Sequence, residues 1–171
     1  MGQGFVLLCG LMSLCMFSVQ VTGDYHKEGV HDCSKEKIIP SAILVAQSNK
    51  TTVKSPISFG NIYAFDDPLT VGPEPTSQVI GNAQGTYVLS GQDKLSLVMS
   101  ADFGFTTGEF NGSSFGVMSR NPISETSRET AIVGGRGKFR LARGYAELKT
   151  QYLNFTNGDA IIEYHATVYH Y

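Results

Sequence analysis

Charged side chains are scarce in this chain of 171 residues, and the two signs nearly cancel. Lys, Arg, Asp and Glu make up 16% of the residues and leave a formal net charge of −2. A surface so close to neutral displaces few counterions from a phosphate backbone, so no nucleic-acid partner is expected. The sequence also has no Trp and no segment with the 3.6-residue apolar period of an amphipathic helix. These absences exclude a helical bundle and a basic nucleic-acid-binding protein.

No charged residue occurs in the first 23 positions. Residues 5–21 are nearly all apolar, and Val21 and Gly23 place small residues at the −3 and −1 positions of a cleavage site. This pattern predicts a secretory signal peptide at residues 1–23, and therefore a secreted, extracellular protein with no membrane segment. The alternative is a retained membrane anchor. It is disfavoured because glycine and polar residues interrupt the run, which falls short of the ~20 apolar residues of a span.

Cysteine is also scarce. After removal of the predicted leader, Cys33 is the only one, so its thiol is either unpaired or bonded to another chain. No cluster of His, Cys and acidic residues has metal-ligand spacing, and Gly134–Lys138 lacks the pattern of a phosphate-binding loop. We therefore expect no metal and no cofactor. Three sequons, at Asn49, Asn111 and Asn154, are candidate glycosylation sites of a secreted chain.

The rest of the chain is a series of short β-type runs separated by Gly, Pro and Asn. In Leu95–Thr106 every second residue is apolar over six positions, which is typical of a half-buried strand. Asn157-Gly158 predicts a hairpin between two further strands. Pro68 is expected to end the strand at residues 58–66, because proline cannot donate to a ladder. The strands are expected at 39–47, 58–66, 79–90, 95–106, 113–119, 129–133, 143–153 and 160–169.

About eight short strands joined by tight turns predict an antiparallel barrel or a sandwich. The many glycines at strand bends favour the barrel, which with about eight strands can hold one small ligand. The polar residues 24–38 are expected to form a flexible arm before this domain, which covers residues 39–171. Two polar segments, Arg120–Pro122 and Ser127–Glu129, bracket a loop near one rim. Their arginines are either pocket residues that hold an anionic oxygen or part of a surface ion-pair cluster of little energetic value.

The chain contains, in order, the motifs FDDPLT (65–70), GNAQGTY (81–87), GEFNGSS (108–114), SRNP (119–122), SRETAIVGGRGKFRLARGYA (127–146) and GDAIIEY (158–164). Together these motifs resemble those of the plant dirigent proteins, and the resemblance covers residues 40–171. It implies an all-β, eight-stranded antiparallel barrel of the dirigent (allene-oxide-cyclase-like) type. It also implies a homodimer or homotrimer in the apoplast that directs the stereoselective coupling of phenoxy radicals in lignan biosynthesis. A separate laccase or peroxidase makes those radicals from phenols such as coniferyl alcohol, so the protein itself needs no redox centre.

The resemblance also suggests site residues. Arg128 matches the pocket arginine and Tyr87 a pocket tyrosine, whereas Asn121 stands where pinoresinol-forming members carry Asp. Asn cannot exchange a proton near neutral pH, although it can hydrogen-bond. Asp102 is the candidate pocket carboxylate, with an outward, solvent-facing position as its alternative. Two aromatic residues on the apolar face of Leu95–Thr106 are expected to line the pocket, namely Phe103 and Phe105.

The chain departs from the family before residue 40. Residues 34–39 run directly into Pro40, where relatives carry a Phe-His-Asp strand, so the first barrel strand is expected to be missing. An open barrel exposes unpaired backbone groups. Such a chain is a splice or gene-model variant, pairs its open edge with another chain, or is poorly stable. Two functions besides radical coupling therefore remain open: a dehydratase or cyclase acting on an isoflavanol or quinone methide, and an inactive, binding-only paralogue.

Overall fold

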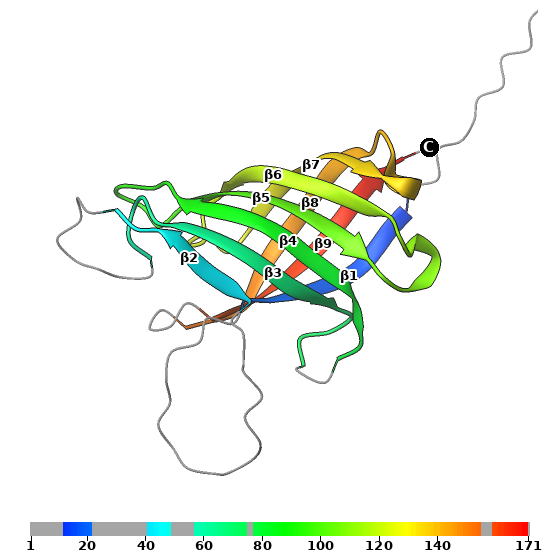
Figure 1. Cartoon of the computed structure of the whole chain (residues 1–171), viewed down its shortest axis with the longest axis horizontal. Helices are drawn as coiled ribbons and strands as arrows, with labels where there is room; N and C mark the ends of the chain where they lie inside the picture. Colours follow the sequence, from blue (N-terminus) through cyan, green and yellow to red (C-terminus); the bar gives the residue numbers. More distant parts are fainter. Residues whose placement is uncertain (1–11, 22–40, 49–56, 75–76, 155–158, 171) are drawn as a thin grey trace, which may run out of the picture.

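The computed structural model describes residues 12–21, 41–48, 57–74, 77–154 and 159–170. These residues form one antiparallel sheet of nine strands, with two 3₁₀ turns between strands (Figure 1). No helix in the described ranges has the length and apolar character needed to cross a membrane. The elements are β1 (Met12–Val21), β2 (Ala42–Ala46), β3 (Ile62–Thr70), β4 (Val79–Leu89), β5 (Leu97–Phe105), η1 (Gly108–Phe110), β6 (Ser114–Asn121), β7 (Arg128–Arg136), η2 (Gly137–Phe139), β8 (Arg143–Leu153) and β9 (Ala160–Tyr169).

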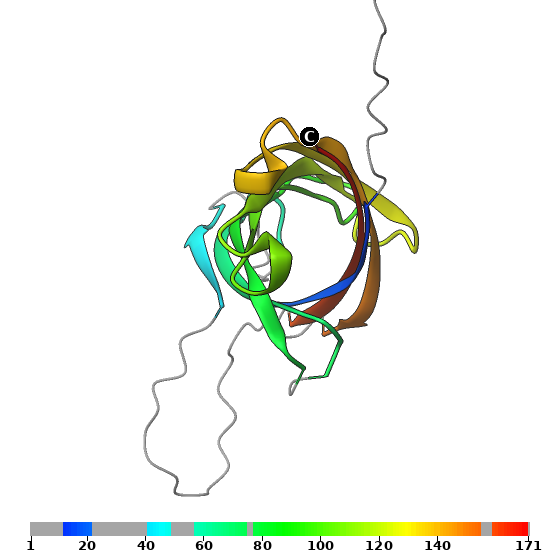
Figure 2. The same ribbon diagram turned by 90° about the vertical axis from the view of Figure 1, so that its right-hand side faces the viewer.

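The sheet curls into a closed ring of eight strands, because β1 pairs with both β9 and β3. Figure 2 looks along this ring, with β1 between β9 and β3 and with β2 outside it. Along β3, the short strand β2 pairs with the first half, with Ala42 opposite Phe65, and β1 pairs with the last two residues. The expected eight-stranded antiparallel barrel is confirmed, and β2 is an additional strand on its edge.

The strand that closes the barrel was expected to be missing, and Met12–Val21 takes its place. Sequence reasoning assigned this segment to a leader, because a continuous apolar run is equally compatible with a leader and with a buried strand. Whether the chain is processed stays a prediction. Cleavage near Gly23 would remove β1 from the barrel, since all of its residues precede that position. The predicted arm at 24–38 lies outside the described residues.

Pro68 lies inside β3, opposite Asn82 of β4, so the expectation that it ends the strand is wrong. The backbone amide of Asp66 donates to the carbonyl of Ser41, which precedes β2, and therefore points away from β4. The nitrogen of Pro68, two residues further on, points to the same edge of β3. That position lies between the pairings made by β2 and β1. A proline is tolerated there because no hydrogen bond to β4 is lost.

The other expected strands are found, with β8 and β9 at the expected bounds and β7 longer at its glycine-rich end. One end of the barrel is filled by phenylalanines from β5, β6 and the two 3₁₀ turns. Their ring centroids are 4.9 Å apart for Phe110 and Phe139 and 5.8 Å apart for Phe105 and Phe115. Phe115 and Phe139 are fully buried. We call this cluster, Phe105, Phe110, Phe115 and Phe139, the aromatic plug.

Two glycines allow β4 to follow the curvature of the ring. A Cβ atom at Gly85 would lie 2.2 Å from the carbonyl oxygen of Ser100 on β5. At Gly81 the same atom would lie 1.9 Å from the carbonyl oxygen of Gly104. Only glycine fits such close backbone approaches. Ala83, Tyr87 and Leu89 share this face of β4 with the two glycines and point to the inner side of the barrel.

Candidate functional site

The end of the barrel opposite the plug is where β6 connects to β7, and Arg128 is buried beside it with 4% of its surface exposed. Its Nη1 donates to Oδ1 of Asn121 at 3.0 Å, and its Nη2 donates to the hydroxyl of Thr150 on β8. The three residues come from three adjacent strands of the curled sheet. Burial lowers the pKa of Arg128, and the nearby Tyr164 partly opposes this effect.

The alternative of a surface ion-pair cluster is wrong for Arg128. Arg120, Glu125 and Glu129 are exposed. The ion pair found within the described ranges lies elsewhere, between His165 and Glu163. Arg128 therefore faces the interior, where its charge acts through a medium of low dielectric constant.

The carboxylate inside the barrel is that of Asp67 on β3, which is fully buried. A hydrogen bond from the Ser41 side chain lowers the pKa of Asp67. Burial is the larger effect and raises the pKa of Asp67 to about 7, with a further contribution from Asp66. A carboxyl group with this pKa can both donate and accept a proton near neutral pH.

Aromatic side chains form the walls between Asp67 and the open end. The rings of Tyr63 and Tyr87 are stacked with centroids 4.9 Å apart, and Phe65 packs against Tyr87 at 5.9 Å. Burial raises the pKa of Tyr87, as do the charges of Tyr63 and Asp67. Because β3 runs away from the open end, Tyr63 lies nearer that end and Asp67 lies deeper.

Tyr164 of β9 is buried between the two charged groups. Its ring meets that of Phe103 edge to face at 5.0 Å, and its hydroxyl lies 3.9 Å from the sulfur of Met99. Burial raises its pKa, whereas the positive charge of Arg128 lowers it and the negative charge of Asp67 raises it. Tyr164 therefore lies within electrostatic range of both Arg128 and Asp67. We call this group of interior side chains, Tyr63, Asp67, Tyr87, Arg128 and Tyr164, the polar chamber.

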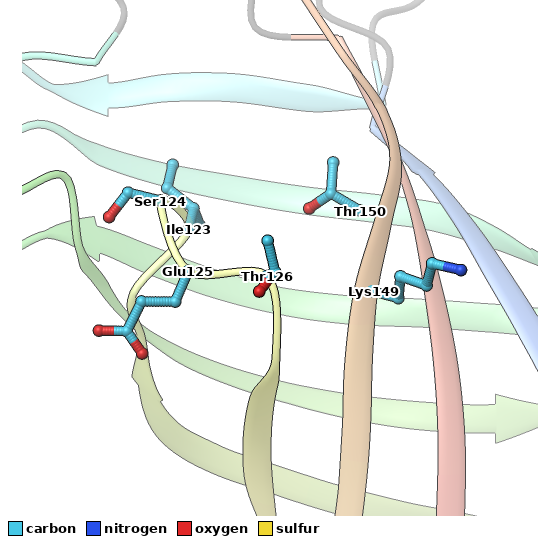
Figure 3. A pocket seen from close by; sticks show the side chains of 6 residues that line it. All are labelled: Ile123, Ser124, Glu125, Thr126, Lys149 and Thr150. Atoms are coloured by element: carbon cyan, nitrogen blue, oxygen red, sulfur yellow. The ribbon is translucent and has the colours of Figure 1, made fainter.

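A cavity of about 240 Å³ opens at this end of the barrel (Figure 3). It is lined by the loop from Ile123 to Thr126 and by Lys149 and Thr150 of β8. In Figure 3 the side chains of Thr126 and Thr150 lie across the opening from each other. Thr150 also accepts the hydrogen bond from Arg128, so this residue both lines the cavity and contacts the guanidinium group.

The structure brings together only some of the residues proposed from sequence. Arg128, Asn121 and Tyr87 lie at the chamber, and Phe103 is buried beside Tyr164. Phe105 instead belongs to the aromatic plug, which corrects its assignment to the pocket.

Asp102 is exposed on the outer surface, where it accepts a hydrogen bond from Ser114 at 2.9 Å. It therefore cannot be the pocket carboxylate. Sequence reasoning missed Asp67, although alternation along Phe65-Asp66-Asp67 could have identified it, because Phe65 and Asp67 share the inner face.

The structure describes two of the three sequon asparagines, Asn111 and Asn154. Asn111 is exposed at the turn after η1, so its side chain is accessible to a glycan. Asn154 follows β8 and its backbone amide donates to the carbonyl of Asp159. Asn49 lies outside the described residues. Glycosylation of all three remains a prediction.

The described residues form an eight-stranded antiparallel barrel that is plugged at one end and has polar and aromatic groups at the other, an architecture that can hold one small ligand. Residues 30–169 match the family model described as Dirigent-like protein, and the chain belongs to this family.

Relatives support this assignment. Dirigent protein 15 of Arabidopsis thaliana is 53% identical over 137 residues, which cover 77% of this chain and 72% of that protein. Pterocarpan synthase 1 of Glycyrrhiza echinata is 50% identical over 133 residues, which cover 77% and 70%. The solved structure of the pterocarpan synthase dirigent protein GePTS1 superposes with a TM-score of 0.81 at 42% identity, covering 95% of this chain and 91% of that one.

Proposed function

We propose that this protein is an acid–base catalyst that closes a ring on a phenolic substrate with loss of water. The proposed substrate class is an isoflavanol or a related hydroxylated phenol that can form a quinone methide. The observation that carries the proposal is Asp67, a buried carboxyl with a pKa of about 7 inside an aromatic-lined chamber. The similarity to pterocarpan synthases in sequence and in structure favours the same class of reaction.

In the first step Asp67, protonated, donates its proton to the leaving hydroxyl group, and the C–O bond breaks to release water. The phenol oxygen loses its proton to the solvent, and its electrons move through the ring to the carbon that the water has left, which gives a quinone methide. In the second step another phenol oxygen of the substrate forms a C–O bond to that carbon. Asp67, now a carboxylate, takes the proton of the attacking hydroxyl, and the quinone-methide oxygen regains a proton from the solvent. The net change is the loss of one water and no redox change.

The other groups of the chamber suit this reaction. The positive charge of Arg128 stabilises negative charge that develops on the phenol oxygen. The stacked rings of Tyr63 and Tyr87 offer an apolar surface for a planar substrate. Since Tyr63 lies nearer the open end, a substrate entering there passes these rings before it reaches Asp67.

The test is turnover of an isoflavanol by the full chain without any oxidant, measured as the appearance of a dehydrated, cyclised product by mass spectrometry. Asp67→Asn is expected to lower kcat by about 10²–10⁴, the range for removal of a general acid. The matched control is Asp66→Asn, because Asp66 is exposed on the same strand and binds Asn82 and Gln84 on the outer surface. Equal rates for the Asp67→Asn variant and the wild type would refute the proposal.

A second candidate is stereoselective coupling of phenoxy radicals, favoured by the similarity to dirigent protein 15. In this role the chamber binds two radicals supplied by a separate laccase or peroxidase, and the protein provides no redox chemistry. Secretion to the apoplast and assembly as a dimer or trimer belong to this second proposal. Adding the protein to coniferyl alcohol and a laccase, and then resolving the enantiomers, separates the candidates. A racemic product together with turnover of the isoflavanol favours the cyclase, and turnover of neither favours a binding-only protein.

A further inference from the structure

The charge of Arg128 has no carboxylate partner within the described part of the chain. Its two hydrogen bonds go to the neutral side chains of Asn121 and Thr150. Its Nε is buried without a hydrogen-bond partner. A buried charge that lacks a counter-ion is unfavourable, and an anion that reaches it relieves this penalty.

Asn121 is the residue that leaves this charge uncompensated. Its Oδ1 lies 3.0 Å from Nη1 of Arg128. A carboxylate oxygen at this distance would form a close ion pair with the guanidinium group. An aspartate at position 121 would neutralise the charge of Arg128 in place of a bound anion. The asparagine keeps the hydrogen bond and orients the guanidinium group, but it adds no negative charge.

The cavity offers an anion access to this charge through Thr150. The hydroxyl oxygen of Thr150 accepts from Arg128, so its own hydrogen is available to donate, and the side chain lines the cavity. An oxygen anion in the cavity would accept from Thr150 and would lie next to the guanidinium group behind it.

The other ionisable groups near this place are few. Tyr164 of β9 faces Arg128, and Asp67 of β3 lies in electrostatic range of Tyr164 and of Tyr87. At the mouth, Glu125 and Lys149 are both exposed and therefore screened by solvent. In Figure 3 the ammonium group of Lys149 and the carboxylate of Glu125 point away from Thr150. Arg128 is thus the buried cation in this neighbourhood.

We propose that this site binds its phenolic ligand as the phenolate, and that Asn121 determines this preference. The proposal rests on the proposed function for the class of ligand, but it concerns the ionisation state in which that ligand is held. On binding, the phenol O–H bond breaks, the electron pair stays on oxygen, and the proton passes to the buffer. The phenolate oxygen accepts from Thr150 and pairs with the charge of Arg128. A substrate bound in this way already has the electron density that expels a leaving group.

The size of the effect follows from the charge. An opposite charge about 4–6 Å away lowers the pKa of an acidic group by about 1–3 units. We therefore expect the ratio of phenolate to phenol to be at least about tenfold higher on the protein than in free solution at the same pH.

The test uses para-nitrophenol, whose phenolate absorbs at longer wavelength than its phenol form. The bound probe is titrated by absorbance with the full-length protein in excess. The expected result is a downward shift of the bound probe's pKa by at least about one unit. In Asn121→Asp the shift should be lost, since the new carboxylate neutralises Arg128. The matched control is Ser100→Asp, which adds the same charge at an exposed position on β5 and should leave the shift intact.

Thr150→Val gives a second variant of similar shape, which removes the hydroxyl that is proposed to contact the anion and should reduce the shift. An unshifted titration in the wild type, or a full shift in Asn121→Asp, would overturn the proposal. The probe carries no leaving hydroxyl, so its titration is independent of ring closure. A shifted probe without isoflavanol turnover would uphold this inference and reject the proposed reaction, and turnover with an unshifted probe would do the reverse.

Discussion

Replacing Asp67 with Asn should stabilise the protein, and the gain should depend on pH. The pKa of this carboxyl is about 7 in the folded chain, compared with an ordinary value of 3.8. Because the folded state holds the proton more tightly than the unfolded state, stability falls as the pH rises from about 4 to about 7. Asn is always neutral, so the variant avoids this loss.

The magnitude follows from the two pKa values. Each unit of difference corresponds to about 1.4 kcal/mol. The difference of about three units therefore sets a ceiling of roughly 4 kcal/mol on the gain in unfolding free energy above pH 7. Below pH 4 the wild type and Asp67→Asn should differ little, since the carboxyl is protonated in both states. For a chain of this size, each kcal/mol raises Tm by roughly 2–4 °C.

The assay is urea unfolding, followed by tyrosine fluorescence or circular dichroism, at several pH values between 4 and 8. Asp66→Asn is the control, because its carboxylate is exposed and hydrogen-bonded to two amides. A difference in unfolding free energy between Asp67→Asn and the wild type that stays constant from pH 4 to pH 8 would refute the reasoning. It would mean that Asp67 is not a buried, protonatable group.

Three further predictions concern the barrel. A chain that begins after Gly23 lacks β1, which pairs with β9 at eight positions. At about 1 kcal/mol per hydrogen bond, urea unfolding should show that the unfolding free energy falls by ~5 kcal/mol or more. An unchanged midpoint would contradict the role of β1 in closing the barrel. Phe115→Ala, in the plug, should lower the unfolding free energy by about 3–5 kcal/mol, and a loss below 1 kcal/mol would show that the plug is loosely packed. Gly85→Val should prevent accumulation of folded protein in a solubility and circular-dichroism assay, since β5 leaves no room for a side chain, whereas Thr86→Val at a neighbouring exposed position should fold normally.

The sequence predicted most of the barrel because its strands carry local signals. The alternation of apolar and polar residues from Leu95 to Phe105 indicates which side chains are buried. The bounds of β8 and β9 follow from flanking glycines and polar residues. Pro68 was misjudged because its effect depends on which edge its nitrogen faces, and that is set by the pairing of β3 with its neighbours. The role of Met12–Val21 could not be predicted because leaders and buried strands share the same apolar composition.

The site was less predictable than the fold. Arg128 and Asn121 could be identified as a pair only through the family resemblance, since spacing alone was compatible with a surface cluster. The carboxylate was assigned to the wrong strand, because periodicity gives the two faces of a strand but does not rank acidic residues on different strands. Asp67 became recognisable once its complete burial was known. Phe105 was wrongly assigned to the pocket because alternation shows that its side chain points inward but does not show at which end of the barrel it lies. That end is filled by Phe115 and Phe139, which pack against Phe105.

The most direct test of the central claim is the pH profile of isoflavanol turnover by the full chain in the absence of an oxidant. If Asp67 is the proton donor, kcat/KM should fall above about pH 7, where the carboxyl loses its proton. Asp66→Asn should keep a fall of this kind at a lower pH, because the charge of Asp66 contributes to the raised pKa of Asp67, whereas Asp67→Asn should abolish the fall together with most of the activity. Turnover in Asp67→Asn at the wild-type rate, with the same fall near pH 7, would contradict the account.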